Sequence, residues 1–153
     1  MELLIIVFLL GGLFLGWSLG ANDAANVFGT AVGTRMVQFK TAAIICSVFV
    51  ILGAIISGSG TTETLGKLGS INALPGAFSA CVAAGLSVYL MTKLGLPVST
   101  TQAIVGAIIG WNLYTGSSTN IQVLITILST WVLCPIIAGL IAMLFFVITK
   151  NFI

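Results

Sequence analysis

The sequence contains no histidine and few charged residues, with three acidic and five basic side chains among 153 residues. Charged residues make up 5% of the chain, whereas a soluble globular domain carries about 25%. A net charge of +2 is too small to indicate a nucleic-acid partner. Because histidine is absent and only one acid lies deep in an apolar run, we find no nucleophile–base pair and expect no enzyme.

Cysteines are also few, and none has a paired spacing. Cys46, Cys81 and Cys134 each lie in an apolar run, which favours small buried side chains over a metal or redox site. We therefore expect no bound cofactor.

Apolar residues are abundant, at 59% of the chain, with a mean hydropathy of +1.25. They form long unbroken runs without the alternation of an outer-membrane barrel, so the sequence predicts an all-α integral membrane protein. The first run resembles a signal peptide, but its start carries Glu2 and no Lys or Arg. We interpret it as a membrane helix in a multi-pass protein of the cell membrane.

One transmembrane domain is expected over residues 1–153, with about five membrane segments. The apolar runs are residues 3–19, 41–57, 76–92, 97–111 and 121–149. Residues 97–111 would extend about 22 Å as a helix, short of a hydrocarbon core of about 30 Å, so this segment is predicted to be broken or re-entrant. Pro135 predicts a kink or break in the last segment.

The basic residues predict an orientation if all five segments cross. Four of the five then lie on the cytoplasmic side, namely Arg35, Lys40, Lys93 and Lys150. Lys67 lies outside, in a polar segment after a predicted break at Ser57–Gly60. Glu63 and Lys67 have the spacing of a helical ion pair, and a solvated loop helix is the preferred interpretation.

The first polar cluster, residues 20–26, places Asp23 inside a hydrophobic stretch. A carboxylate in lipid costs about 2.5–3.5 kcal/mol, so it normally faces a partner or a wet cavity. An alternative is that this cluster caps the next helix. Both interpretations, a functional carboxylate and a helix cap, hold if a helix begins here at membrane depth.

The second polar cluster, residues 97–102, contains the capping-box pattern Ser-x-x-Gln and predicts a helix that begins near residue 100. Its hydroxyls, on Ser99, Thr100 and Thr101, could bind phosphate-like oxygens at a helix N-terminus, although an ordinary cap is the preferred interpretation of this cluster alone. Two such clusters together favour an anion transporter with discontinuous helices. No basic side chain lies deep in an apolar run, so the anion would need a co-bound cation, for which Asp23 is the natural ligand or proton carrier.

Both clusters resemble motifs of the inorganic phosphate transporter (PiT) family. Residues 20–33 read GANDAANVFGTAVG and are similar to GANDxANxxGTxVG, and residues 95–106 read GLPVSTTQAIVG and are similar to GLPVSTTHxIVG. Residues 62–65, TETL, resemble a TETI stretch. The resemblance covers nearly the whole chain and implies symport of inorganic phosphate with Na⁺ or H⁺.

The resemblance also implies site residues. Phosphate is expected at Asn22, Asp23, Asn26, Ser99, Thr100 and Thr101. The coupling cation is expected at Asp23, Asn22, Asn26 and Thr30, with Na⁺ at Asp23 and Asn26. The sequence departs from the family at Gln102, where His is usual, and at Val50, where many relatives have an acid.

The family carries the GAND-type motif twice, in two inverted repeats, and this chain carries it once. We therefore expect one repeat of an inverted-repeat transporter, which pairs with a second half or forms an oligomer in the lipid bilayer. The alternatives are a permease for sulfate or another oxyanion, and a truncated membrane subunit that does not transport.

Overall fold

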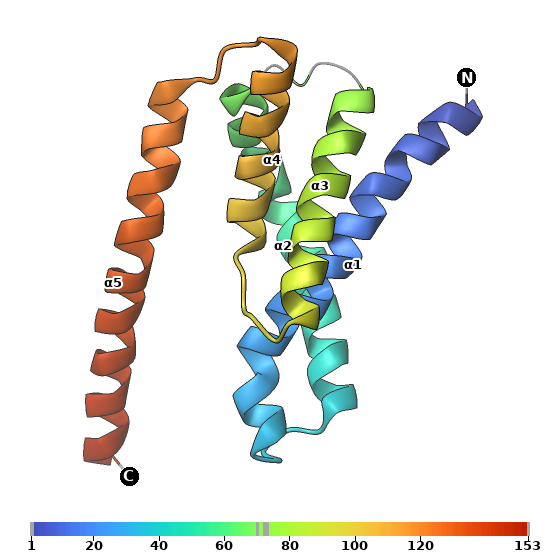
Figure 1. The fold of residues 1–153 in the computed structure, drawn as a ribbon. Helices are drawn as coiled ribbons and strands as arrows, with labels where there is room; N and C mark the ends of the chain where they lie inside the picture. The colour runs from blue at the N-terminus through green and yellow to red at the C-terminus, as the bar shows by residue number, and fades with distance from the viewer. Residues whose placement is uncertain (1, 70, 72–73, 153) are drawn as a thin grey trace. The chain divides into compact units, whose positions relative to one another are not determined.

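The computed structural model describes residues 2–69, 71 and 74–152, and its described part is almost entirely helical (Figure 1). The helices are α1 (Glu2–Gly33), α2 (Phe39–Leu68), α3 (Leu74–Lys93), α4 (Thr100–Thr115) and α5 (Ile121–Phe152). The predicted all-α class is confirmed. Helices α1 to α4 form one compact unit, and α5 forms a second unit that begins at Asn120.

Four helices, α1, α2, α3 and α5, are long and apolar enough to cross a membrane. Helix α4 has 16 residues and extends about 24 Å, less than the hydrocarbon thickness of about 30 Å. The chain is therefore a multi-pass membrane protein. By length and composition, the fourth of the five predicted segments is not a full span, as its short apolar run indicated.

Two breaks expected from the sequence are absent. Helix α1 continues through residues 20–26, and α2 continues through residues 57–60 as far as Leu68. In lipid every backbone group must be paired within its own segment, which favours an unbroken helix even across glycine and serine. Hydroxyls in this part of α2 bond back to carbonyls of the same helix, as the Thr62 hydroxyl does to the Gly58 carbonyl at 2.9 Å.

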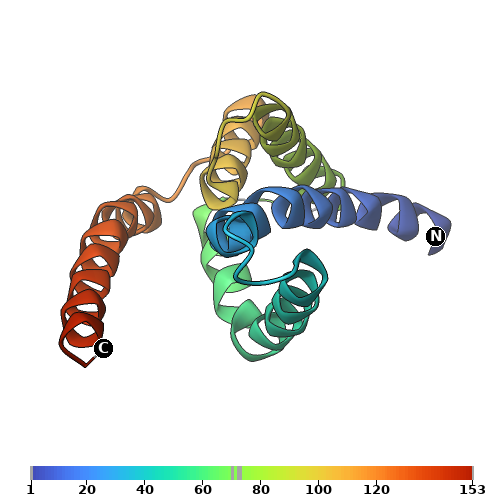
Figure 2. The ribbon, with the colours of Figure 1, turned by 90° about the horizontal axis from the view of Figure 1, so that it is seen from below.

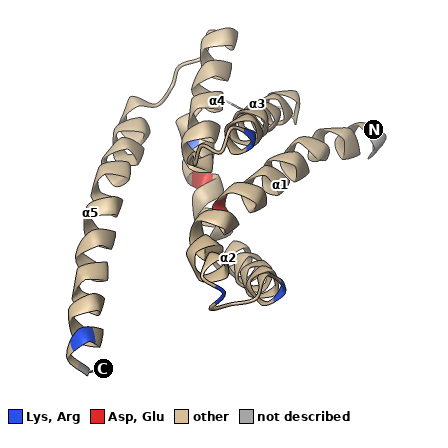
Figure 3. Cartoon of the chain, turned by 60° about the horizontal axis from the view of Figure 1, so that its bottom comes forward, with Lys and Arg blue, Asp and Glu red and all other residues tan. Residues whose placement is uncertain are grey.

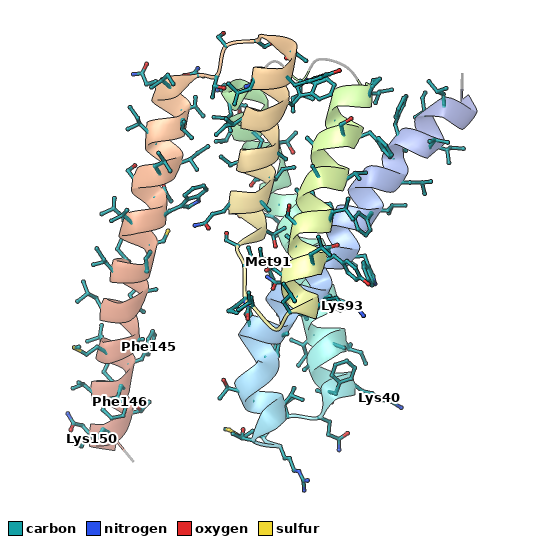
Figure 4. The ribbon with its side chains drawn as sticks, in the orientation of Figure 1. Lys40, Met91, Lys93, Phe145, Phe146 and Lys150 are labelled. Atoms are coloured by element: carbon teal, nitrogen blue, oxygen red, sulfur yellow. The ribbon has the colours of Figure 1, made fainter. Side chains whose placement is uncertain are left out.

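Helix α5, considered alone, starts with the Asn120 side chain, whose Oδ1 accepts hydrogen bonds from the amides of Gln122 and Val123 at 3.1 and 3.2 Å. Of the kink or break expected at Pro135, the break is absent, because the helix continues through this residue. From Val132 to Ile148 its apolar side chains are exposed, Phe145 and Phe146 among them (Figure 4).

Helix α3 packs along α1 in the same direction. Gly11 lies against Phe78 near the start of the contact, and Gly85 lies against Phe14 further along. A Cβ atom at Gly11 would approach the Phe78 ring to 2.8 Å, and one at Gly85 would approach the Phe14 ring to 2.7 Å. Small residues thus allow the two helices to approach closely, as is typical of membrane helix pairs.

Helix α4 returns antiparallel to α3, and the two helices form a hairpin. Figure 2 shows this hairpin on one side of α1 and α2 on the other. The hairpin is shorter than its neighbours, and its tip, residues 94–99, ends well before the lower ends of α1 and α2 (Figure 1). A short hairpin therefore brings its tip to the middle of a long helix.

The other end of the hairpin is fixed to the end of α2. Gly69 lies so close to α4 that a Cβ atom there would be 2.6 Å from Ile108 and 2.8 Å from the Asn112 amide nitrogen. Asn112 is fully buried and donates a hydrogen bond to the Thr119 hydroxyl at 2.9 Å.

The polar and sulfur side chains outside these contacts are mostly exposed. The Glu63–Lys67 ion pair is present on the surface of α2, as its spacing predicted, although α2 is continuous there rather than a separate loop helix. Cys46 and Cys81 are only half-buried and Cys134 is exposed, so the prediction that all three are buried in the chain is wrong.

Candidate functional site

Asn22 lies in the middle of α1, where the hairpin tip meets that helix. Its side chain is 4% exposed, and its amide nitrogen donates to the carbonyl of Val98 at 2.6 Å and to the Asp23 carboxylate at 2.9 Å. Both partners are hydrogen-bond acceptors. The reverse orientation of the Asn22 amide would place its oxygen, another acceptor, against them. Asn22 therefore joins α1 to the extended segment that precedes α4.

Asp23 is held by α4. The hydroxyl of Thr100 lies 3.2 and 3.3 Å from the two carboxylate oxygens, and Thr100 is 6% exposed. The carboxylate is half-buried and receives hydrogen bonds from two uncharged side chains. Two residues 77 positions apart in the sequence, one from each predicted polar cluster, are thus in direct contact.

The start of α4 agrees with the predicted capping box. The helix begins at Thr100, Ser99 is its N-cap, and the Ser99 hydroxyl accepts from the Gln102 amide at 3.3 Å. The amides of Thr100 and Thr101 belong to the first turn, where a helix has no internal acceptor for them. The side chains of Ser99 and Thr101 are exposed, and only Thr100 of the three hydroxyls contacts Asp23.

The turn of the hairpin is fixed by glycine. Gly95 has a φ of +71°, and the amide of Leu96 bonds to the carbonyl of Met91 at 2.9 Å. This is the Schellman arrangement that ends many helices. Pro97 then keeps the chain extended, so the Val98 carbonyl is available to Asn22.

Asn26 and Thr30 do not join this cluster. They lie about 6 and 12 Å further along α1 than Asn22, beyond the hairpin tip, and both are exposed. The structure thus brings Asn22, Asp23 and Thr100 together, and leaves these two predicted cation ligands uncovered within the described part of the chain.

Lys93 ends α3, next to the site, and its predicted cytoplasmic position stays a prediction. Its neighbour Thr92 contacts Asn22, and its ammonium lies 5.6 Å from the centre of the Tyr89 ring. Tyr89 packs on Trp17, which is about 120° around α1 from Asp23. Lys93 forms no ion pair with Asp23, and among the described residues the only ion pair is the one on α2. Figure 3 shows how few other charges the helices carry.

Three groups at the site were missed by sequence reasoning: Thr92, Ser18 and the Val98 carbonyl. The Thr92 hydroxyl lies 3.4 Å from the Asn22 oxygen, and Ser18, one turn before Asn22, is 1% exposed. Ser18 shares a helical face with Asn22, which is a usable signal. Thr92 gives no such signal, because its role depends on how α3 pairs with α1.

The two positions that depart from the motif pattern are both exposed. Gln102 lies in the first turn of α4 and contributes its backbone amide to the cap. Val50 lies on the exposed surface of α2. Neither side chain contacts Asp23 in the structure.

A model of the phosphate transporter family matches residues 19–153. A protein of Pyrococcus furiosus named as a phosphate permease is 35% identical over 94% of this chain, and one of Chlamydia pneumoniae is 36% identical over 98%. An inorganic phosphate transporter of Arabidopsis thaliana, named as chloroplastic, is 32% identical over 99%. The chain spans 37%, 38% and 28% of these three relatives. No solved structure matches it significantly. With the family match covering most of its length, the chain belongs to the phosphate transporter family.

Proposed function

We propose that this chain is one half of a transporter that carries inorganic phosphate across the membrane together with Na⁺ or H⁺. The observation that carries the proposal is the contact of Asp23 with Thr100, which joins the two family motifs at mid-helix depth. Family membership supports the substrate, and the coupling and the half-transporter arrangement are our inference.

Phosphate would bind where the first turn of α4 meets Asp23. The free amides of Thr100 and Thr101 and the positive end of the helix dipole favour an anion. Ser99 and Asn26 would add further polar contacts. Phosphate retains a proton near neutral pH and can donate it in a hydrogen bond to the Asp23 carboxylate, whereas fully ionised sulfate has no proton to donate. Asp23 therefore favours phosphate over sulfate.

A cation is needed because Asp23 adds negative charge beside the anion and no basic side chain of the described residues forms an ion pair with it. Inward movement of an anion also opposes a negative interior, by about 2.3 kcal/mol per charge per 100 mV. A cation or proton bound at Asp23 and Asn22 would offset both costs, and Thr30, about 12 Å further along α1, would contribute only through the part of the site that extends beyond the hairpin tip.

A second half would complete the site. Asn26 and Thr30 are exposed beyond the hairpin tip, and polar side chains at membrane depth normally face protein or water. The longer relatives have length for further helices. We propose that either a separate half or a second copy of this chain covers this part of α1.

Uptake of labelled phosphate into proteoliposomes that contain only this chain tests the proposal. Na⁺ and H⁺ gradients are imposed separately, with sulfate as competitor. Gradient-driven uptake that sulfate does not inhibit would support phosphate symport and identify the cation. If the inserted chain neither takes up nor binds phosphate, alone or together with a second GAND-containing half, the proposal is wrong.

A further inference from the structure

The connection between α1 and α2, residues 34–38, carries positive charge without a compensating acid. Arg35 lies in this connection and Lys40 lies in the first turn of α2, and both side chains are exposed. Along the helices the nearest acid is Asp23, about 15 Å back from the end of α1. Neither cation forms an ion pair with any of the described residues. Their counter-charge therefore has to come from outside this part of the chain.

The backbone at Arg35 is unfavourable for this residue type. Its φ is +61°, the one positive value at a residue other than glycine in the described part of the chain. At the end of a helix this left-handed conformation usually falls to glycine or asparagine, because a larger side chain raises its free energy. The turn is otherwise well bonded, since the amides of Arg35 and Val37 reach the carbonyls of Val32 and Ala31 at 3.0 and 3.1 Å. An arginine where the turn itself favours glycine indicates that its side chain has another role.

Two large apolar side chains accompany the cations and are left uncovered. Met36 is 81% exposed and Phe39 is 74% exposed. Residues 41–56 of α2 follow at once and carry no charge, so the hydrocarbon core begins directly after Lys40. The Lys40 side chain extends outward from α2 at this end (Figure 4). Exposed apolar groups beside cations at this depth are typical of segments that lie among lipid head groups.

We propose that Arg35 and Lys40 bind the phosphate groups of anionic phospholipids, while Met36 and Phe39 insert between the lipids. A guanidinium can hold two phosphate oxygens at once, and an ammonium adds a second point charge. Each cation close to an anionic membrane surface strengthens binding about 5-fold. The inference does not depend on the proposed transport of phosphate. Free inorganic phosphate shares the chemistry of the head group, so the test has to separate these two sources.

Fluorescence quenching beside the α1–α2 connection tests the lipid site. The three native cysteines are replaced by alanine, a fluorophore is attached at Gln38→Cys, and the full chain is placed in phosphatidylcholine nanodiscs. The quencher is either phosphatidylglycerol or phosphatidylcholine, each with a nitroxide near the head group. Phosphatidylglycerol should reach half of its full quenching at a concentration at least about 5-fold lower than phosphatidylcholine does.

Variants assign this preference to the two cations. Arg35→Gln and Lys40→Gln should each reduce it several-fold, and the double variant should remove it. Arg35→Lys keeps the charge on the same backbone and should retain most of the preference. Lys67→Gln is the matched control, because it removes one charge from an exposed lysine that is already paired with Glu63, and it should leave the preference unchanged.

Equal quenching by the two lipids overturns the inference, and so does a preference that survives in the double variant. Loss of the preference in Lys67→Gln as well would show a general effect of net charge and would also contradict a site at the α1–α2 connection. Inorganic phosphate is then added at constant ionic strength. It should leave the quenching unchanged, and displacement of the phosphatidylglycerol quencher would identify a site for the free anion instead of a lipid.

Discussion

Asp23 has a carboxylate in the middle of a membrane helix with only uncharged hydrogen-bond donors, from Asn22 and Thr100. Neutral donors reduce the desolvation cost of the carboxylate but leave its charge in place. We propose that the coupling cation balances this charge. This separates Asp23 from a structural acid, which would be paired with Lys or Arg.

Asp23→Asn should abolish cation-coupled phosphate uptake while the protein still inserts. Asparagine removes the charge that attracts the cation and replaces an acceptor with a donor amide, so the preference for protonated phosphate over sulfate should also fall. Proteoliposome uptake with sulfate as competitor measures both effects. Uptake by Asp23→Asn equal to that of the unchanged chain would refute the role assigned to the carboxylate.

Thr100→Val should weaken phosphate binding by about 10-fold, because Asp23 loses a donor worth about 1.5 kcal/mol and its position changes. Thr100→Ser keeps the hydroxyl and should bind nearly as well as the unchanged chain. Thr115→Val, at the other end of α4, is a matched control, since its hydroxyl bonds only within α4 and the following turn. The measurement is equilibrium binding of labelled phosphate. Equal phosphate affinities of the Thr100→Val and Thr100→Ser variants would contradict the prediction.

Individual site residues were predictable to the extent that motifs contain them. The motif resemblance and the rarity of charge both indicated Asp23, and the structure brings it together with Asn22 and Thr100 from the predicted set. Ser99, Thr100 and Thr101 all carry hydroxyls, so the sequence could not show that only Thr100 would contact Asp23. That selection depends on the rotation of α4 about its axis, which packing against α3 determines.

The hairpin of α3 and α4 is the element that positions the site, and it is held at both ends. Its tip bonds to Asn22, and its far end packs against Gly69 at the end of α2. The backbone of Gly69, with a φ of −148°, is accessible to any residue. Its small size, rather than its conformational freedom, is therefore what the packing requires.

Gly69→Ala should lower the free energy of unfolding by about 1–3 kcal/mol, the usual cost of overpacking. The new methyl group would lie 2.6 Å from Ile108 and 2.8 Å from the Asn112 amide, which is buried and cannot move freely. Gly66→Ala, three residues earlier on α2, has open space around its Cβ and should be no less stable than the unchanged chain. Thermal unfolding in detergent compares the two, and equal stability would show that the hairpin end is loosely packed.

Helix boundaries were predicted correctly where side-chain chemistry specified them and incorrectly where only polarity suggested them. Ser99 and Gln102 specified the start of α4 through a defined hydrogen bond. The glycines and serines of residues 57–60 would favour a loop in a water-soluble protein. In a membrane the backbone has no alternative partner, so α2 remains helical there.

Two of the five basic residues, Arg35 and Lys40, flank the connection between α1 and α2 (Figure 3). By the positive-inside rule we expect this connection to lie in the cytoplasm. Asn22 lies about 16 Å from the end of α1 at Gly33, so we expect the hairpin tip to lie inside the membrane.

Labelling of single cysteines with a membrane-impermeant maleimide should distinguish this arrangement from five full crossings. With the three native cysteines replaced by alanine, Gln38→Cys should react quickly from the cytoplasmic side. Leu94→Cys, at the hairpin tip, should react much more slowly from that side. If all five segments crossed, position 94 would lie in the cytoplasm, and equal labelling rates at the two positions would exclude the buried tip.

The bond between Asn22 and the hairpin uses the Val98 carbonyl rather than a side chain. Every amino acid supplies that carbonyl, so mutation at position 98 can change the side chain without removing the hydrogen bond. Asn22 has no such freedom, because no other side chain offers two protons and an oxygen at the same reach. Natural variation should therefore accumulate at position 98 while position 22 stays fixed, and the contact would be invisible to methods that infer proximity from correlated substitutions.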